Sequence, residues 1–186
     1  MSNYDKVYVE KRRSDIAQNI YLKNRQADDG QNIFLQYYDD PSITLDNLYS
    51  ISTGIDKLLS KHVWLKSGAS LVIEHTEAFN VIDVNTEKAG KNNRNKESTF
   101  LKINLEAATE IARQIRLRNL SGIILIDFIN MKIQENVDEL LAFLKSELEK
   151  DRVSTHVVDI TKLGIVEVTR KKTQKPLYEI IGKLHK

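Results

Sequence analysis

The 186 residues are enough for one ordinary domain or two small subdomains, and with 41% hydrophobic and 29% charged residues we expect a sizeable core under a well-solvated surface. The formal net charge of +2 is too small to indicate nucleic-acid binding by itself, and the lack of cysteine excludes disulfides, thiolate metal sites and a cysteine nucleophile in this chain. No segment reaches the roughly 18 apolar residues of a membrane span, and the polar first residues predict no signal peptide. The lack of cysteine fits a cytoplasmic protein, which is the location we expect.

The hydrophobic pattern predicts alternating strands and helices from the start of the chain. Strands are expected at residues 6–10 and 32–38, and helices at residues 14–25 and 45–61. Gly54 lies inside the second of these helices and weakens its prediction, because glycine is unfavourable in a helix interior.

The same alternation continues to the end of the chain. Further strands are expected at residues 62–66, 70–74, 79–85, 123–129, 155–160 and 165–169, with helices at residues 99–120, 134–150 and 177–185. The polar, basic stretch 86–96 is predicted to be a loop over an open or mobile site. We therefore expect an α/β fold of mixed sheets with flanking helices, in two closely packed subdomains covering residues 1–66 and 67–186.

Two predicted strands contain a carboxylate where an apolar residue would be expected. Alternation puts Asp83 and Asn85 on one face of their strand, and Asp127 interrupts a strongly apolar run. If the two strands are parallel neighbours joined by the long helix, both acidic side chains lie near the same edge of the sheet. Two close carboxylates repel each other unless a cation lies between them, and Mg²⁺ suits such a pair. Asn85 would then orient a ligand or contact a scissile phosphate.

The residues alone leave other interpretations open. Each aspartate could instead form a structural ion pair with Arg113 or Arg116 of the adjacent helix, and spacing does not decide between an ion pair and a metal site. Basic side chains that could contact phosphates occur after Asn85 and near the C-terminal end; these are Lys88, Lys91, Arg94, Arg170 and Lys171. A solvated basic surface explains the same residues.

Four strings of residues in this order resemble the catalytic segment of the ribonuclease E/G family. They are residues 68–79, Ile82-Asp83-Val84-Asn85, residues 104–118 and Ile126-Asp127-Phe128-Ile129. The resemblance covers residues 60–172 well, as the family's deoxyribonuclease I-like subdomain. It covers residues 4–60 more loosely, as part of the ribonuclease H-like subdomain.

The resemblance implies a Mg²⁺-dependent endoribonuclease of RNA processing and decay that hydrolyses single-stranded RNA to 5′-phosphate and 3′-hydroxyl ends. Asp83 and Asp127 would be the Mg²⁺ ligands, and Asn85 would support them in catalysis. A non-catalytic RNA-binding or assembly module derived from the same family is the alternative.

The chain also departs from the family in several ways. The S1-type domain, the 5′-monophosphate sensor and the zinc-sharing cysteine pair that usually accompany this region are not visible, so we interpret the sequence as a catalytic-core fragment. A homo-oligomer stays open, without the zinc link between subunits. Asn130 stands where the resemblance leads us to expect a second acidic residue.

Overall fold

The computed structural model describes residues 6–10, 34–86 and 96–184. The chain forms two compact units, Met1–Ile55 and Asp56–Lys186, which are described separately. The predicted helix at residues 14–25 lies outside the described residues. The assignment of the units to ribonuclease H-like and deoxyribonuclease I-like subdomains, and their packing, stay predictions.

The first unit contains a two-stranded parallel sheet and a short helix. Strands β1 (Lys6–Glu10) and β2 (Phe34–Tyr38) pair in register from Lys6 with Phe34 to Glu10 with Tyr38. Helix α2 (Leu45–Tyr49) follows, and the Thr44 side chain caps it by accepting a hydrogen bond from the backbone of Asn47 at 3.2 Å. Both strands were predicted.

The single helix predicted for residues 45–61 is wrong, because the chain breaks it at Ser50. This residue has a φ of +50° and closes α2, and α3 (Ile51–Leu59) begins directly after it. The Asp46 carboxylate accepts hydrogen bonds from the backbone N–H and the hydroxyl of Ser52 at 2.8 and 2.9 Å, which stabilises the new start. Gly54 lies inside α3.

The second unit is built on a six-stranded mixed sheet with the order β3-β4-β5-β6-β8-β7. The strands are β3 (His62–Trp64), β4 (Ser70–His75), β5 (Phe79–Asn85), β6 (Gly122–Asp127), β7 (Thr155–Ile160) and β8 (Ile165–Arg170). Only β5 and β6 of this sheet pair in parallel, and the other neighbours are antiparallel. The α/β fold with a mixed sheet is confirmed.

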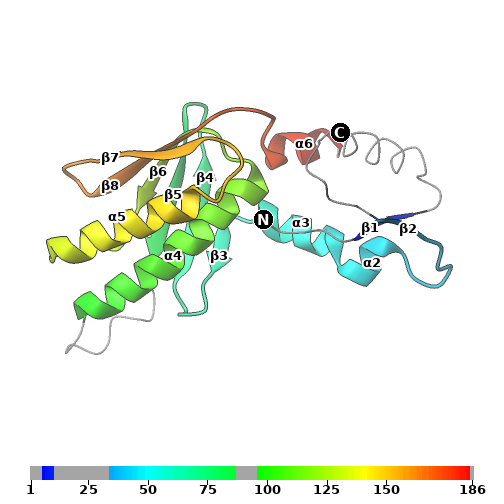
Figure 1. The fold of residues 1–186 in the computed structure, drawn as a ribbon, viewed down its shortest axis with the longest axis horizontal. Coiled ribbons are helices and arrows are strands. Elements are labelled where there is room, and N and C mark those ends of the chain that lie inside the picture. The colour runs from blue at the N-terminus through cyan, green and yellow to red at the C-terminus, as the bar shows by residue number, and fades with distance from the viewer. Residues whose placement is uncertain (1–5, 11–33, 87–95, 185–186) are drawn as a thin grey trace. The chain divides into compact units, whose positions relative to one another are not determined.

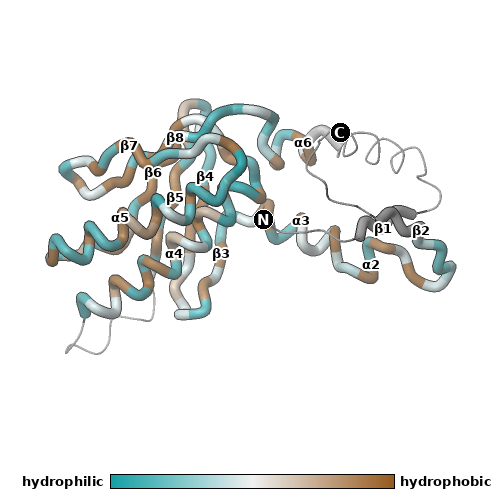
Figure 2. The backbone as a smooth tube through the Cα atoms, viewed as in Figure 1, coloured by the Kyte–Doolittle hydropathy of each residue, from teal (hydrophilic) through white to brown (hydrophobic). Residues whose placement is uncertain are grey.

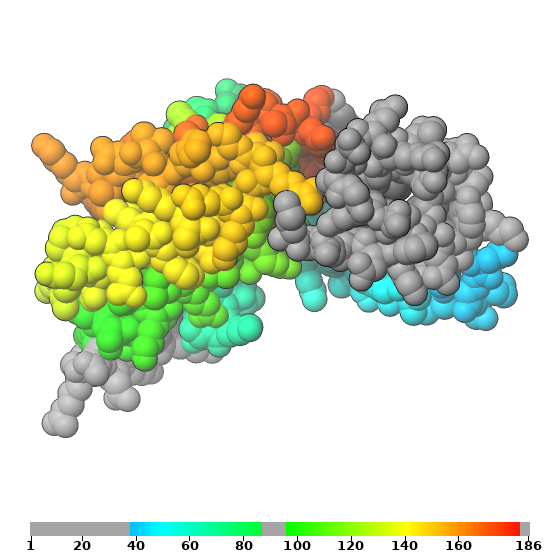
Figure 3. All heavy atoms as spheres, viewed as in Figure 1, coloured from blue at the N-terminus to red at the C-terminus, as the bar shows by residue number. Residues whose placement is uncertain are grey.

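Two long helices cover one face of this sheet (Figure 1). Helix α4 (Lys96–Arg118) makes the crossover from β5 to β6, and α5 (Gln134–Leu148) leads from β6 towards β7. Hydrophobic and hydrophilic positions alternate along both helices (Figure 2), as expected of helices with one buried side. Their atoms hide much of the sheet in the space-filling view (Figure 3). The last helix, α6, covers Leu177–Leu184.

The core lies between the sheet and these helices. Its fully buried side chains come from every second residue of β5, β6 and β8 and from one side of each helix; they include Ile82, Ile124, Ile126, Val166, Val168, Ile111, Ile115 and Leu144. The intervening strand residues therefore face away from the helices. Within the described parts of the chain, no helix is both long and apolar enough to cross a membrane.

Candidate active site

Asp83 and Asp127 end two neighbouring parallel strands, β5 and β6, and are direct partners in their register. Adjacent strands lie about 4.8 Å apart, so the two carboxyl groups leave the sheet close to each other. Ile82 and Ile126, the residues just before them, are fully buried under the helices. Both aspartates are therefore on the sheet face opposite α4 and α5, and both are half-buried. This is the arrangement that a parallel crossover predicts.

The electrostatics of the pair disfavour two negative charges without a counterion. Burial raises the pKa of the Asp83 carboxyl above its ordinary value of 3.8, and the negative charge of Asp127 raises it further. Hydrogen bonds from Asn85 and from the backbone of Val84 act in the opposite direction without cancelling the rise in the pKa. A cation bound between the carboxylates would remove the repulsion that raises this pKa.

Asn85 is fixed to the acidic pair by its side chain. Its Nδ2 donates a hydrogen bond to Oδ2 of Asp83 at 2.7 Å, and the residue is exposed at the end of β5. The bond holds the Asp83 carboxylate in one orientation beside Asp127. The structure thus brings together the three predicted site residues, while their catalytic and metal-binding roles stay predictions.

The alternative of structural ion pairs with helix α4 finds no support in the described residues. Arg113 pairs with Glu110 at 2.8 Å, and Arg116 donates to the backbone oxygen of Glu147 at 3.3 Å. None of the described ion pairs includes either aspartate.

Asn104 fixes the backbone that follows Asp127, a role that was not predicted from the sequence. Its side chain is fully buried and makes two hydrogen bonds with Ile129, donating to the backbone oxygen at 2.8 Å and accepting from the backbone N–H at 3.0 Å. Glu97, at the start of the same helix, accepts a bond from the backbone of Lys132 at 2.9 Å. Helix α4 therefore holds the segment after β6 at two points. This role could have been predicted from an asparagine at a position where the apolar pattern of the helix predicts burial.

The donor set at the edge of the sheet consists of oxygen ligands that could hold Mg²⁺. Among the described residues no group of three or more His, Asp or Glu side chains is arranged to hold a metal ion. The site offers two carboxylates and an amide, and Mg²⁺ is commonly held by one or two carboxylates while it keeps several waters.

The predicted RNA-binding residues have different outcomes. Lys88, Lys91 and Arg94 lie outside the described residues, and Lys171 is exposed. The prediction for Arg170 is wrong, because its side chain is only 4% exposed and is used inside the protein. Its guanidinium pairs with Asp151 at 2.8 Å and donates to Asn119 Oδ1 at 2.7 Å and to the backbone oxygen of Leu120 at 3.0 Å. These bonds join the ends of α4 and β8 instead of contacting phosphate.

Comparison with known proteins connects this geometry to one family. The sequence pattern of the Ribonuclease E/G family matches residues 1–173. The chain is 44% identical over 135 residues to Ribonuclease G of Haemophilus influenzae, which covers 73% of this chain and 27% of the relative. It is 41% identical over 147 residues to Ribonuclease G of Escherichia coli strain K12, covering 79% and 30%. Ribonuclease E of Synechocystis is 40% identical over 141 residues, covering 76% and 21%.

These matches span most of this chain but less than a third of each relative. A family pattern over nearly the whole length and identities of 40% or more agree with each other. The chain therefore belongs to the ribonuclease E/G family.

Proposed function

We propose that this chain carries the catalytic core of a Mg²⁺-dependent endoribonuclease that hydrolyses single-stranded RNA in RNA processing and decay, leaving 5′-phosphate and 3′-hydroxyl ends. The observation that carries the proposal is the pairing of Asp83 with Asp127 at the ends of parallel strands, on the sheet face opposite α4 and α5. Membership of a family named for ribonucleases supports the nuclease activity.

Each residue of the site has a defined task in this proposal. Asp83 and Asp127 hold the Mg²⁺ ion, and Asn85 keeps Asp83 in one orientation through its 2.7 Å hydrogen bond. A Mg²⁺ ion held by these residues would activate a water for attack and would stabilise negative charge on a phosphoryl oxygen. Asp83 has to lose its proton before it can serve as a ligand, so its raised pKa makes the site sensitive to acid.

The rigidity of the site comes from the buried side of the same strands. Residues on either side of each aspartate pack into the core, so the carboxylates cannot move apart without disturbing the sheet. Asn104 fixes Ile129, two residues beyond Asp127, from the crossover helix. Such support matters because small displacements of catalytic groups cost large factors in rate.

Cleavage of a 5′-monophosphorylated, A/U-rich single-stranded RNA tests the proposal. The parent chain is compared in Mg²⁺ and in EDTA with Asp127→Asn and with the control Asp138→Asn, which makes the same chemical change at an exposed site on α5. We expect internal cleavage that requires Mg²⁺. Its rate should fall by at least about 100-fold in Asp127→Asn and stay unchanged in Asp138→Asn.

Two results would count against the proposal. Cleavage that survives in Asp127→Asn would exclude this aspartate from the reaction. A folded parent chain that binds the RNA but never cuts it, with equal affinity in Asp127→Asn and a steep dependence on salt, would favour a non-catalytic binding module.

A further inference from the structure

A cavity with mostly apolar walls and a few charged side chains lies towards the other end of β4 and β5 from the acidic pair. Its volume is about 420 Å³, and its walls come from the end of α3, β4, β5, the end of α4 and α6. Val72 faces Asp83 across the sheet, whereas His75, which lines this cavity, faces Asn80. The lining reaches Val81, two residues or roughly 7 Å along β5 from Asp83, but it includes neither Asp83 nor Asp127, so the cavity is distinct from the acidic pair.

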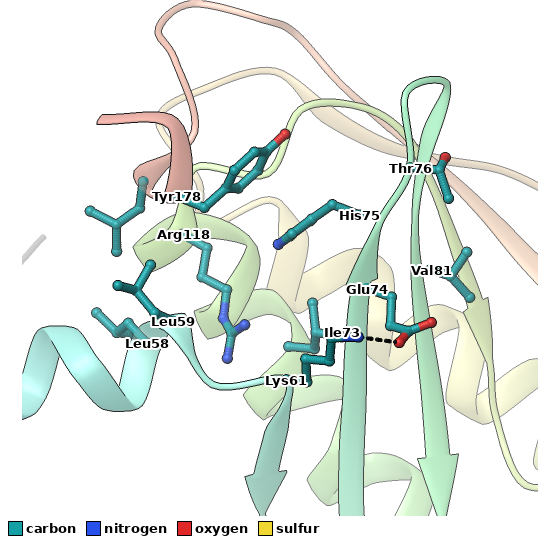
Figure 4. A pocket seen from close by; sticks show the side chains of 11 residues that line it. Leu58, Leu59, Lys61, Ile73, Glu74, His75, Thr76, Val81, Arg118 and Tyr178 are labelled. Carbon is teal, nitrogen blue, oxygen red and sulfur yellow. Dashed lines mark hydrogen bonds and ion pairs between the residues drawn. The ribbon is translucent and has the colours of Figure 1, made fainter. Parts of the chain in front are cut away.

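The most unusual group in the cavity is the Arg118 guanidinium. Arg118 is only 3% exposed, and its Nε donates to Oε1 of Gln114 at 2.7 Å, but its Nη2 is buried without a hydrogen-bond partner. Figure 4 shows this guanidinium directed into the space between α3 and β4. A buried donor left without a partner is costly, and a buried charge without a counterion is costlier.

No carboxylate among the described residues neutralises Arg118. Glu110 lies on the same helix, but its Oε1 already accepts bonds from Arg113 at 2.8 Å and from Gln114 at 2.7 Å. Burial lowers the pKa of Arg118 from its ordinary value, and the charge of Glu110 opposes that change without removing it. An anion that enters the cavity would supply the missing acceptor and counter-charge.

The other walls offer a flat aromatic surface and a second cation. The rings of His75 and Tyr178 are stacked, with centroids 4.3 Å apart and an angle of 20° between their planes. His75 is held by a 2.8 Å hydrogen bond between Nδ1 and Asn80 Oδ1. Lys61 stands in the same wall, paired with Glu74 at 2.9 Å, and both of these side chains are more than half exposed (Figure 4).

We propose that this cavity binds a nucleotide, with Arg118 donating hydrogen bonds to its phosphate and the stacked rings of His75 and Tyr178 lying against its base. A guanidinium is suited to a planar pair of phosphate oxygens, and aromatic rings accept any base on their faces. The volume is in the range of small-ligand sites and suits one nucleotide. The occupant is either a free mononucleotide or one nucleotide of an RNA chain. The site does not depend on the metal-binding role of the acidic pair.

Calorimetric titration of the full chain in EDTA tests this proposal. The three ligands are uridine 5′-monophosphate, inorganic phosphate and uridine, the nucleoside that lacks the phosphate. We expect saturable binding of the nucleotide, weaker binding of phosphate and at least about tenfold weaker binding of uridine, since a charge-assisted hydrogen bond is lost. Arg118→Met is expected to weaken nucleotide binding by at least about tenfold. The control Arg113→Met removes an equal charge from an exposed position of the same helix and is expected to leave it unchanged.

A variant at the surface of the cavity keeps the test decisive if Arg118→Met does not fold. Tyr178→Leu removes one stacked ring from an exposed position, and we expect it to weaken the nucleotide and to leave inorganic phosphate unaffected. Competition by an oligouridylate with hydroxyl groups at both ends would identify an RNA chain as the occupant, and no competition would identify a free nucleotide. Equal affinity for nucleotide and uridine, or nucleotide affinity that is unchanged in both Arg118→Met and Tyr178→Leu, would overturn the proposal.

Discussion

Replacing Asn104 by alanine removes the two hydrogen bonds that join α4 to the backbone of Ile129. Each bond contributes about 1 kcal/mol net, and the Ile129 groups that lose their partner add about 0.5 kcal/mol or more because they are partly buried. Alanine recovers about 0.5 kcal/mol through its better helix propensity. We therefore expect Asn104→Ala to lower the free energy of unfolding by about 2 kcal/mol. At about 2–4 °C per kcal/mol for a chain of this size, the Tm falls by about 4–8 °C.

Thermal unfolding followed by circular dichroism measures this change. The matched control is Thr109→Ala, which removes an exposed hydroxyl from the same helix where it donates to the Leu105 backbone oxygen at 3.3 Å. We expect the control to stay within about 0.5 kcal/mol of the parent chain. Because Ile129 follows Asp127 by two residues, Asn104→Ala should also reduce Mg²⁺ affinity in the folded protein. A Tm for Asn104→Ala equal to that of the parent would refute the positioning role of this side chain.

Three further predictions follow from charged groups of the second unit. Arg170→Met leaves the buried Asp151 carboxylate unpaired, so denaturant titration should show a loss of about 3–5 kcal/mol in the free energy of unfolding. Lys171→Met, at an exposed position, is expected to stay within about 0.5 kcal/mol of the parent chain. Equal losses in the two variants would contradict the ion pair. Burial tends to raise the pKa of Asp151, but the hydrogen bond and charge of Arg170 bring this pKa below 3.8. The carboxylate therefore stabilises the fold above pH 3.8, and this stabilisation is lost as the pH falls through the pKa of Asp151 in the folded protein. Denaturation curves of Asp151→Asn should therefore show a shallower loss of stability in acid than the parent, and an equally steep loss would exclude this linkage. The pKa of Asp83 is raised, so its contribution to stability is present at low pH and is lost as the pH rises through its pKa in the folded protein. Asp83→Asn should therefore have a higher Tm than the parent chain in EDTA at pH 7. A lower Tm would contradict the charge repulsion between Asp83 and Asp127.

The acidic pair was predictable because it depends on strand periodicity and crossover geometry, which are both local rules. An aspartate inside an apolar run, a long helix and a second apolar run with an aspartate were enough to place Asp83 beside Asp127. The roles of these residues rest on family resemblance, because two neighbouring carboxylates have the same geometry in a metal site as in a structural site.

Arg170 and Arg118 are charged residues whose burial follows from the periodicity of their elements and not from their residue type. Counting basic residues grouped Arg170 with the exposed Lys171, but alternation along β8 places it with the buried Val166 and Val168. Arg118 falls on the apolar stripe of α4, seven residues after Ile111 and three after Ile115, and is buried with them. At both positions the periodicity of the strand or helix predicts a buried side chain, whereas its charge alone predicts an exposed one.

The break between α2 and α3 depends on contacts that a helical pattern does not reveal. Ser50 adopts a left-handed conformation that few residues except glycine and asparagine favour, and the side chain of Asp46 stabilises the start of the second helix instead of continuing the first. Gly54, which weakened the helix prediction, lies inside α3 and does not break it.

Direct binding of a divalent ion tests the central claim without requiring the RNA contacts of a whole enzyme. Mn²⁺ can replace Mg²⁺ at oxygen ligands and is detected by electron paramagnetic resonance, so the chain is titrated with Mn²⁺ and then with competing Mg²⁺. We predict one site that Mg²⁺ displaces, that is lost in both Asp83→Asn and Asp127→Asn, and that is retained in the control Asp138→Asn. Mn²⁺ binding that is unchanged in both site variants, or no binding by the folded parent chain at millimolar Mn²⁺, would contradict the assignment of Asp83 and Asp127 as the metal ligands.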